Sequence, residues 1–164
     1  MSQDLATLLE YLMREHETVS ERAQLLEKAT MLMGIRMRLS QSEYQRLVIQ
    51  CRRLIRKTVT AHFSVEEYAL FPIYRNKSSD ANKTVSELIK EHSEMFDRFI
   101  ECRKIGDYNQ SIKALSDLMN SLALHAKKED HLFSSVSLES AEVESALRGA
   151  CAIGLRQQRR QAER

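Results

Sequence analysis

Apolar residues recur every three or four positions along most of the chain, which is the period of an amphipathic α-helix. A capping-box pattern, Ser40-Gln41-Ser42-Glu43, marks one helix start, and Pro72 should end or kink that same helix. The pattern predicts four helices: one over about 4–38, one from the capping box to a last turn at Pro72, one over about 82–105 and one over about 108–136.

Four long helices with short connections predict an all-α fold, an up-down-up-down four-helix bundle over residues 1–137. A short additional C-terminal helix, at about 138–155, is expected within a segment 138–164 that ends in a basic tail. A loop-rich β-sandwich or barrel is not expected, because the chain has one proline and four glycines.

The composition of the chain indicates its class of protein and its cellular location. With 43% hydrophobic and 29% charged residues, the chain has the composition of a globular protein, and a net charge of +2 does not indicate nucleic acid. No apolar run approaches the roughly 20 residues of a membrane span, and the start lacks the basic region of a secretory signal. Three widely spaced cysteines are typical of reduced thiols. We expect a cytoplasmic protein with no membrane segment and no nucleic-acid partner.

Several candidate metal-binding residues lie at the same helical spacing as the apolar residues, on what we call the apolar stripes of the four predicted helices. Two carboxylates, Glu66 and Glu129, each follow a histidine by four residues, which places both members of each pair on one helical face. Counted from the predicted turns at about 1.5 Å per residue, the candidate side chains reach similar depths, with a largest mismatch of roughly 8–14 Å. Four of the five histidines share these stripes, one on each predicted helix: His16, His62, His92 and His125.

A single histidine on an apolar face is more often a core residue than a ligand. Four histidines and two carboxylates that converge are better explained by a metal site, because buried carboxylates are costly without partners. Imidazole and carboxylate together suit iron, manganese or zinc rather than calcium or magnesium. The residues themselves leave the metal and the number of ions open.

The segments around these residues resemble the hemerythrin-like, HHE cation-binding family. The matching segments are Arg14-Glu15-His16-Glu17, His62-Phe63-Ser64-Val65-Glu66-Glu67 with its Leu70-Phe71-Pro72 end, Glu91-His92, and 125–133. The resemblance implies a bundle around a non-haem di-iron centre that binds or reacts with oxygen, nitric oxide or peroxide in a sensing or redox role. It also implies terminal ligands at His16, His62, His92 and His125, and bridging carboxylates at Glu66 and Glu129.

The sequence departs from the family pattern on the third helix. Oxygen-carrying hemerythrins have a further histidine four residues after the third-helix ligand, and here that residue is Phe96. We therefore expect an incompletely ligated position near His92 and His125 that a small ligand could occupy. His131 lies six residues after His125, which places it off the stripe and on the surface.

Two acidic residues adjoin the predicted bridging carboxylates. Glu67 and Asp130 either face solvent or orient a neighbouring ligand, and Asp130 is also a secondary ligand candidate. Neither is included in the predicted ligand set.

A different class of function stays open. The chain could be an interaction or signalling module with a structural or vestigial metal, in which the C-terminal helix and its Arg-rich tail contact a protein partner. Peroxide decomposition and repair of damaged iron centres are enzymatic alternatives, so the sequence leaves open whether the protein is an enzyme.

Overall fold

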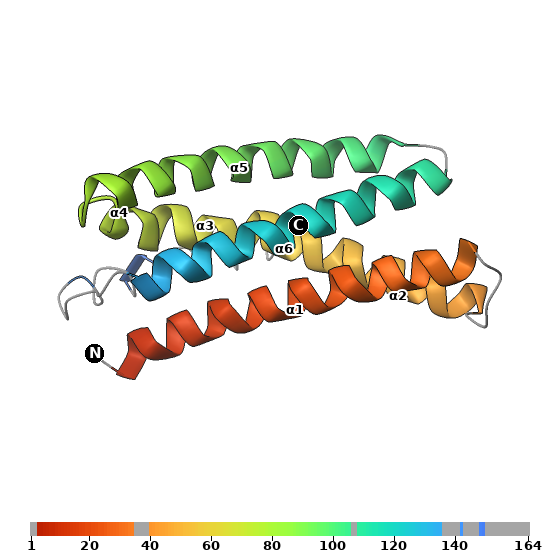
Figure 1. Ribbon diagram of the computed structural model, residues 1–164, viewed down its shortest axis with the longest axis horizontal. Coiled ribbons are helices and arrows are strands. Elements are labelled where there is room, and N and C mark those ends of the chain that lie inside the picture. Colours follow the sequence, from red (N-terminus) through yellow and green to blue (C-terminus); the bar gives the residue numbers. More distant parts are fainter. Residues whose placement is uncertain (1–2, 35–39, 106–107, 136–141, 143–147, 150–164) are drawn as a thin grey trace, which may run out of the picture.

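In the computed structural model, four long helical stretches run alternately up and down along one axis (Figure 1). The structure describes residues 3–34, 40–105, 108–135, 142 and 148–149. Three of the stretches are single helices, α1 (Gln3–Gly34), α5 (Ser79–Lys104) and α6 (Tyr108–Ser135), and the other spans residues 41–74 in several pieces. The predicted all-α, up-down-up-down bundle is confirmed.

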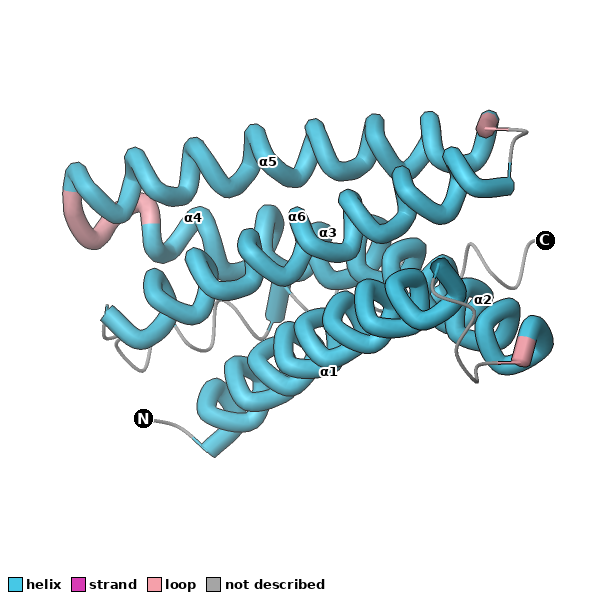
Figure 2. Tube along the Cα trace, turned by 45° about the vertical axis from the view of Figure 1, so that its right-hand side comes forward, coloured by secondary structure: helices cyan, strands magenta, loops and turns pink. Residues whose placement is uncertain are grey.

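Neighbouring helices close the bundle into a ring. The last helix, α6, packs against both α1 and α5, and the 41–74 stretch contacts α1 on one side and α5 on the other (Figure 2). Within the part of the chain that the structure describes, no helix is long and apolar enough to cross a membrane.

Polar caps fix two of the helix starts. Ser40 forms the predicted capping box, in which its hydroxyl accepts from the Glu43 backbone N–H and its own N–H donates to the Glu43 carboxylate at 3.0 Å. The hydroxyl of Ser78 accepts from the Ala81 N–H at 3.0 Å. Helix α5 therefore begins at Ser79, three residues earlier than the pattern predicts, because this cap satisfies a backbone donor that a loop would leave to water.

Two π-helical turns interrupt the 41–74 stretch, and these the sequence pattern did not predict. The pieces are α2 (Gln41–Lys57), η1 (Thr58–His62), α3 (Phe63–Val65), η2 (Glu66–Leu70) and α4 (Phe71–Tyr74). A π turn adds a residue to the helical turn and so rotates the residues that follow it. Pro72 lies in the first turn of α4, and the helix ends two residues later, in agreement with the expected stop.

The apolar core is divided into two clusters. One includes Val19, Leu26 and Leu118 and lies toward the α1–α2 end, and the other includes Leu12, Phe71 and Leu88 and lies toward the opposite end. Buried histidines and carboxylates belong to neither cluster. The bundle therefore contains a polar layer between two apolar ones.

The predicted C-terminal helix and Arg-rich tail lie largely outside the described residues. Of that segment the structure describes Glu142, whose carboxylate pairs with Lys77 at 2.5 Å, and residues 148–149.

Candidate metal centre

The polar layer holds the six predicted ligands, which we call the inner cluster. His16 comes from α1, His62 ends η1 and Glu66 begins η2. All six residues are at most 3% exposed and are supplied by all four helical stretches: His16, His62, Glu66, His92, His125 and Glu129. The structure thus brings together every predicted site residue, including those on α6, whose depth was least certain from residue counting.

The first half of the inner cluster is formed by two facing imidazoles. The Nε2 atoms of His16 and His62 lie 2.9 Å apart. Glu66 Oε1 lies 3.0 Å from His62 Nε2, and Glu129 Oε2 lies 3.2 Å from His16 Nε2. Two imidazole nitrogens and two carboxylate oxygens therefore converge on one small volume.

The second half has the same chemistry. Glu129 Oε1 lies 2.9 Å from His125 Nε2 and 3.2 Å from His92 Nε2. Glu66 Oε2 lies 3.6 Å from His92 Nε2. Each carboxylate thus turns one oxygen to each half of the cluster, which is the arrangement of a carboxylate shared by two ions.

Glu66 shows directly how these donors fit a cation. Both of its oxygens are buried and have no hydrogen-bond partner among the described residues, although His62 Nε2 is only 3.0 Å from one of them. Burying an unpaired carboxylate is expensive, and a nitrogen and an oxygen that approach without hydrogen-bond geometry resemble two ligands of one ion. The donor set fits a metal that takes nitrogen and oxygen ligands.

Four further acidic residues, which we call the outer carboxylates, surround the inner cluster. Each accepts a hydrogen bond from the Nδ1–H of one inner histidine. The pairs are Glu15 with His62 (2.9 Å), Glu67 with His92 (2.8 Å), Glu91 with His125 (2.8 Å) and Asp130 with His16 (2.7 Å). Because an ionised carboxylate can only accept, each bond places a proton on Nδ1 and leaves the Nε2 lone pair for a metal.

These four bonds form a continuous ring around the bundle. A carboxylate on α1 binds a histidine on η1, and a carboxylate on η2 binds a histidine on α5. In the same way a carboxylate on α5 binds a histidine on α6, and a carboxylate on α6 binds a histidine on α1. Every outer carboxylate is also the chain neighbour of an inner residue, as Glu15 is of His16 and Asp130 is of Glu129. Consecutive residues are rotated by about 100° around a helix, so each acidic residue points away from the direction of the neighbouring ligand and toward the adjacent helix.

Sequence reasoning identified two of the outer carboxylates and missed the others. The sequence does not decide whether Glu67 and Asp130 face solvent or orient a ligand. In the structure the carboxylate of each accepts a hydrogen bond from the Nδ1–H of a histidine. Glu15 and Glu91 were seen only as members of family-like segments. The available signal was an acidic residue next to a ligand, but its partner lies on another helix and is invisible in one sequence.

Lysines neutralise two of the outer carboxylates. Lys57 pairs with Glu15, and Tyr11 donates a hydrogen bond to the same carboxylate at 2.7 Å. Burial alone would raise the pKa of Glu15, but hydrogen bonds from His62, Lys57 and Tyr11 lower it to about 2. Lys128 pairs with Glu91 in the same way.

The metal-free cluster holds protons in place of cations. Burial would lower the pKa of His16, but hydrogen bonds and attraction from Glu129 and Glu66 raise it to about 11. The same carboxylates, with help from Glu15 or Glu67, raise the pKa of His62 and of His92 to about 9 against the opposing effect of burial.

Metal binding is therefore expected to release protons. At pH 7.5 the metal-free protein should carry a protonated His92 and one proton between the facing Nε2 atoms of His16 and His62. A ligand imidazole must be neutral, so loading should release about two protons. Affinity should rise with pH as these protons become easier to remove. Calorimetry in buffers of different ionisation enthalpy measures the number released. Binding without proton release would contradict the assignment.

The resemblance to hemerythrins predicts Phe96 beside the metal site, where they have a further histidine, but in the structure Phe96 lies toward the surface. Its side chain is 43% exposed, and Met95 is the buried residue of that turn. The nearest aromatic ring to this half of the cluster is Phe63, whose centroid lies 3.6 Å from that of His92 and 5.6 Å from that of His125. Phe71 also stacks on His92, with a centroid distance of 5.6 Å. His131 is exposed, as predicted.

Comparison with known proteins agrees with this geometry. The sequence model of the hemerythrin HHE cation-binding domain matches residues 7–136, which include all six inner residues and all four outer carboxylates. No curated protein and no solved structure gives a significant match.

Proposed function

The chain belongs to the hemerythrin HHE cation-binding family, and we propose that its inner cluster binds two non-haem iron ions. The observation that carries the proposal is that Glu66 and Glu129 each present one oxygen to each histidine pair. One ion would be held by His16, His62, Glu66 and Glu129, and the other by His92, His125 and Glu129. The second oxygen of Glu66, 3.6 Å from His92 Nε2, would also face the second ion.

The formal charge of the inner and outer residues matches that of two divalent ions. The inner and outer residues contribute six carboxylates, and two lysines, Lys57 and Lys128, pair with outer members. With neutral histidines this set carries a formal charge of −4, which two divalent cations would balance. Glu66 and Glu129 need this compensation most because they are buried, whereas Glu67 and Asp130 are about a third exposed and are partly solvated.

The proposed activity is binding of, or reaction with, oxygen, nitric oxide or peroxide in a sensing or redox role. Iron supplies the redox chemistry and the affinity for such ligands when bound. The chain offers four imidazoles and two carboxylates for two ions that each prefer five or six ligands, so positions stay available to a small molecule. The buried layer excludes water, and the outer ring holds each imidazole in one tautomer.

The proposal extends to the cellular setting. Two cysteines of the described chain, Cys51 and Cys102, are free thiols. Free thiols favour a reducing compartment, which supports a cytoplasmic location.

Metal analysis of anaerobically purified protein tests the proposal directly. We expect up to two iron ions per chain and near-ultraviolet bands, from ligand-to-iron charge transfer, that appear on exposure to air. A matched sample from the Glu129→Ala variant should contain less iron and show weaker bands. Wild-type protein that contains no iron after growth in iron-replete medium, and takes up none on reconstitution, would refute the proposed function.

A further inference from the structure

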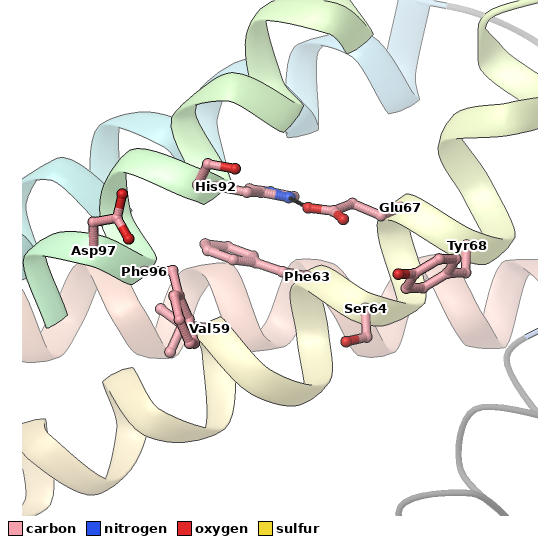
Figure 3. A pocket seen from close by; sticks show the side chains of 9 residues that line it. Val59, Phe63, Ser64, Glu67, Tyr68, His92, Phe96 and Asp97 are labelled. Carbon is pink, nitrogen blue, oxygen red and sulfur yellow. Dashed lines mark hydrogen bonds and ion pairs between the residues drawn. The ribbon is translucent and has the colours of Figure 1, made fainter. Parts of the chain in front are cut away.

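A pocket of about 310 Å³ opens beside the second half of the inner cluster (Figure 3). Its walls come from the second helical stretch, which contributes Phe63, Glu67 and Tyr68, and from α5, which contributes His92 and Phe96. His92 belongs both to this lining and to the inner cluster, where its Nε2 lies 3.2 Å from Glu129. The pocket therefore reaches the outer side of a proposed iron ligand.

Phe63 stands between the pocket and the cluster. Its ring stacks on His92, with an interplanar angle of 10°, and approaches His125 edge-on. Although Phe63 lines the pocket, its side chain is almost completely buried. Phe63 therefore contacts both the pocket and His125, which does not itself line the pocket.

The pocket has a negative lining. Its charged residues are Glu67 and Asp97, and neither lysine nor arginine is among the residues that line it. Glu67 is held at the inner end by His92, whereas Asp97 is exposed on α5. Fields of one sign along a cleft change the association rates of charged ligands by tenfold or more and leave neutral ligands unaffected.

We propose that this pocket is the route by which a small uncharged ligand, of the class of dioxygen, nitric oxide and hydrogen peroxide, reaches the His92 side, with Phe63 as its gate. The acidic lining slows small anions on the same route. The inference rests on the proposed function and adds to it the route and the charge class of the ligand.

The first test needs no metal. The chain contains no tryptophan, so Phe96→Trp places a single indole in the pocket wall. Iodide should quench its fluorescence poorly relative to neutral acrylamide. Adding Asp97→Lys should raise quenching by iodide at least about threefold and leave acrylamide unchanged. Adding Glu21→Lys, an equal charge change at an exposed position of α1, should change neither.

The second test follows ligand binding to iron-loaded protein by stopped flow. Asp97→Lys should accelerate azide binding to the oxidised protein about tenfold and change nitric oxide binding to the reduced protein less than about twofold. Phe63→Leu should accelerate both, because a smaller side chain opens the gate. Should Phe63→Leu lose iron, the exposed position of Asp97 still carries the test, with Glu21→Lys as the matched control.

The outcomes separate the two proposals. Wild-type protein that binds no iron would overturn the proposed function and this inference together. Iron-loaded protein whose azide rate is the same in wild type, Asp97→Lys and Glu21→Lys would overturn the route alone. Equal iodide quenching with aspartate or lysine at position 97 would overturn the charge selectivity.

Discussion

Replacing Glu129 by alanine is expected to abolish binding of at least one of the two proposed ions and to weaken the other more than about 100-fold. Outer partners of metal ligands are worth about 10–100-fold in affinity, and a shared ligand should exceed them. Glu129 approaches His16, His92 and His125 within 3.2 Å, so it serves both halves of the inner cluster. Metal content after dialysis, and titration against a chelator of known affinity, measure the loss.

Two companion variants separate charge from packing. Glu129→Gln keeps the volume of the side chain and removes its charge, so it should lose metal almost as completely as the alanine variant. Glu66→Ala should behave similarly, since its oxygens face both halves. Helical content should persist in all three variants, because the apolar clusters on either side stay intact. Full metal content in Glu129→Gln would contradict a bridging role.

Replacing Glu15 by glutamine is expected to weaken metal binding about 10–100-fold without removing a ligand. Glu15 is the least exposed outer carboxylate, at 15%, and it holds His62 Nδ1 while pairing with Lys57. A neutral amide would hold the imidazole more weakly, since hydrogen bonds to charged acceptors are roughly twice as strong as neutral ones. Chelator competition with iron, or with cobalt as a coloured substitute, gives the affinity.

The matched control is Glu17→Gln, two residues along α1 and exposed. It makes the same chemical change outside the ring of outer carboxylates and should retain wild-type affinity. Glu67→Ala should show an intermediate loss, of about tenfold, because Glu67 supports His92. Equal metal affinities in Glu15→Gln and Glu17→Gln would show that the ring of outer carboxylates does not contribute to metal binding.

The α5 and α6 patterns show how far periodicity reaches. On α5 Val85, Leu88 and His92, which follow one another at helical spacing, are all buried, and on α6 so are His125 and Glu129. An apolar residue at helical spacing faces the core whichever neighbour supplies that core. A pattern within one helix therefore needs no knowledge of the others.

In the second helical stretch a regular helical period no longer predicts which residues are buried. At the helical spacing that leads to His62, Cys51 and Thr58 are buried but Leu47 and Leu54 are only partly so, and Val48 and Ile55 join the core from beside them. The π turns η1 and η2 then change the register around His62 and Glu66. A π turn is a poor local structure that survives because the surrounding contacts hold it, so a regular 3.6-residue period does not predict it.

By itself the sequence determined the helical class, the order of the helices and the six inner residues, because helical spacing records which residues share a face. Only the tertiary structure decided which acid holds which imidazole, since Glu15, Glu67, Glu91 and Asp130 each act on a neighbouring helix. It also decided that Phe63 rather than Phe96 lies against His92. These choices depend on helix rotation and distance across the bundle, and neither quantity is written in the spacing of residues along one chain.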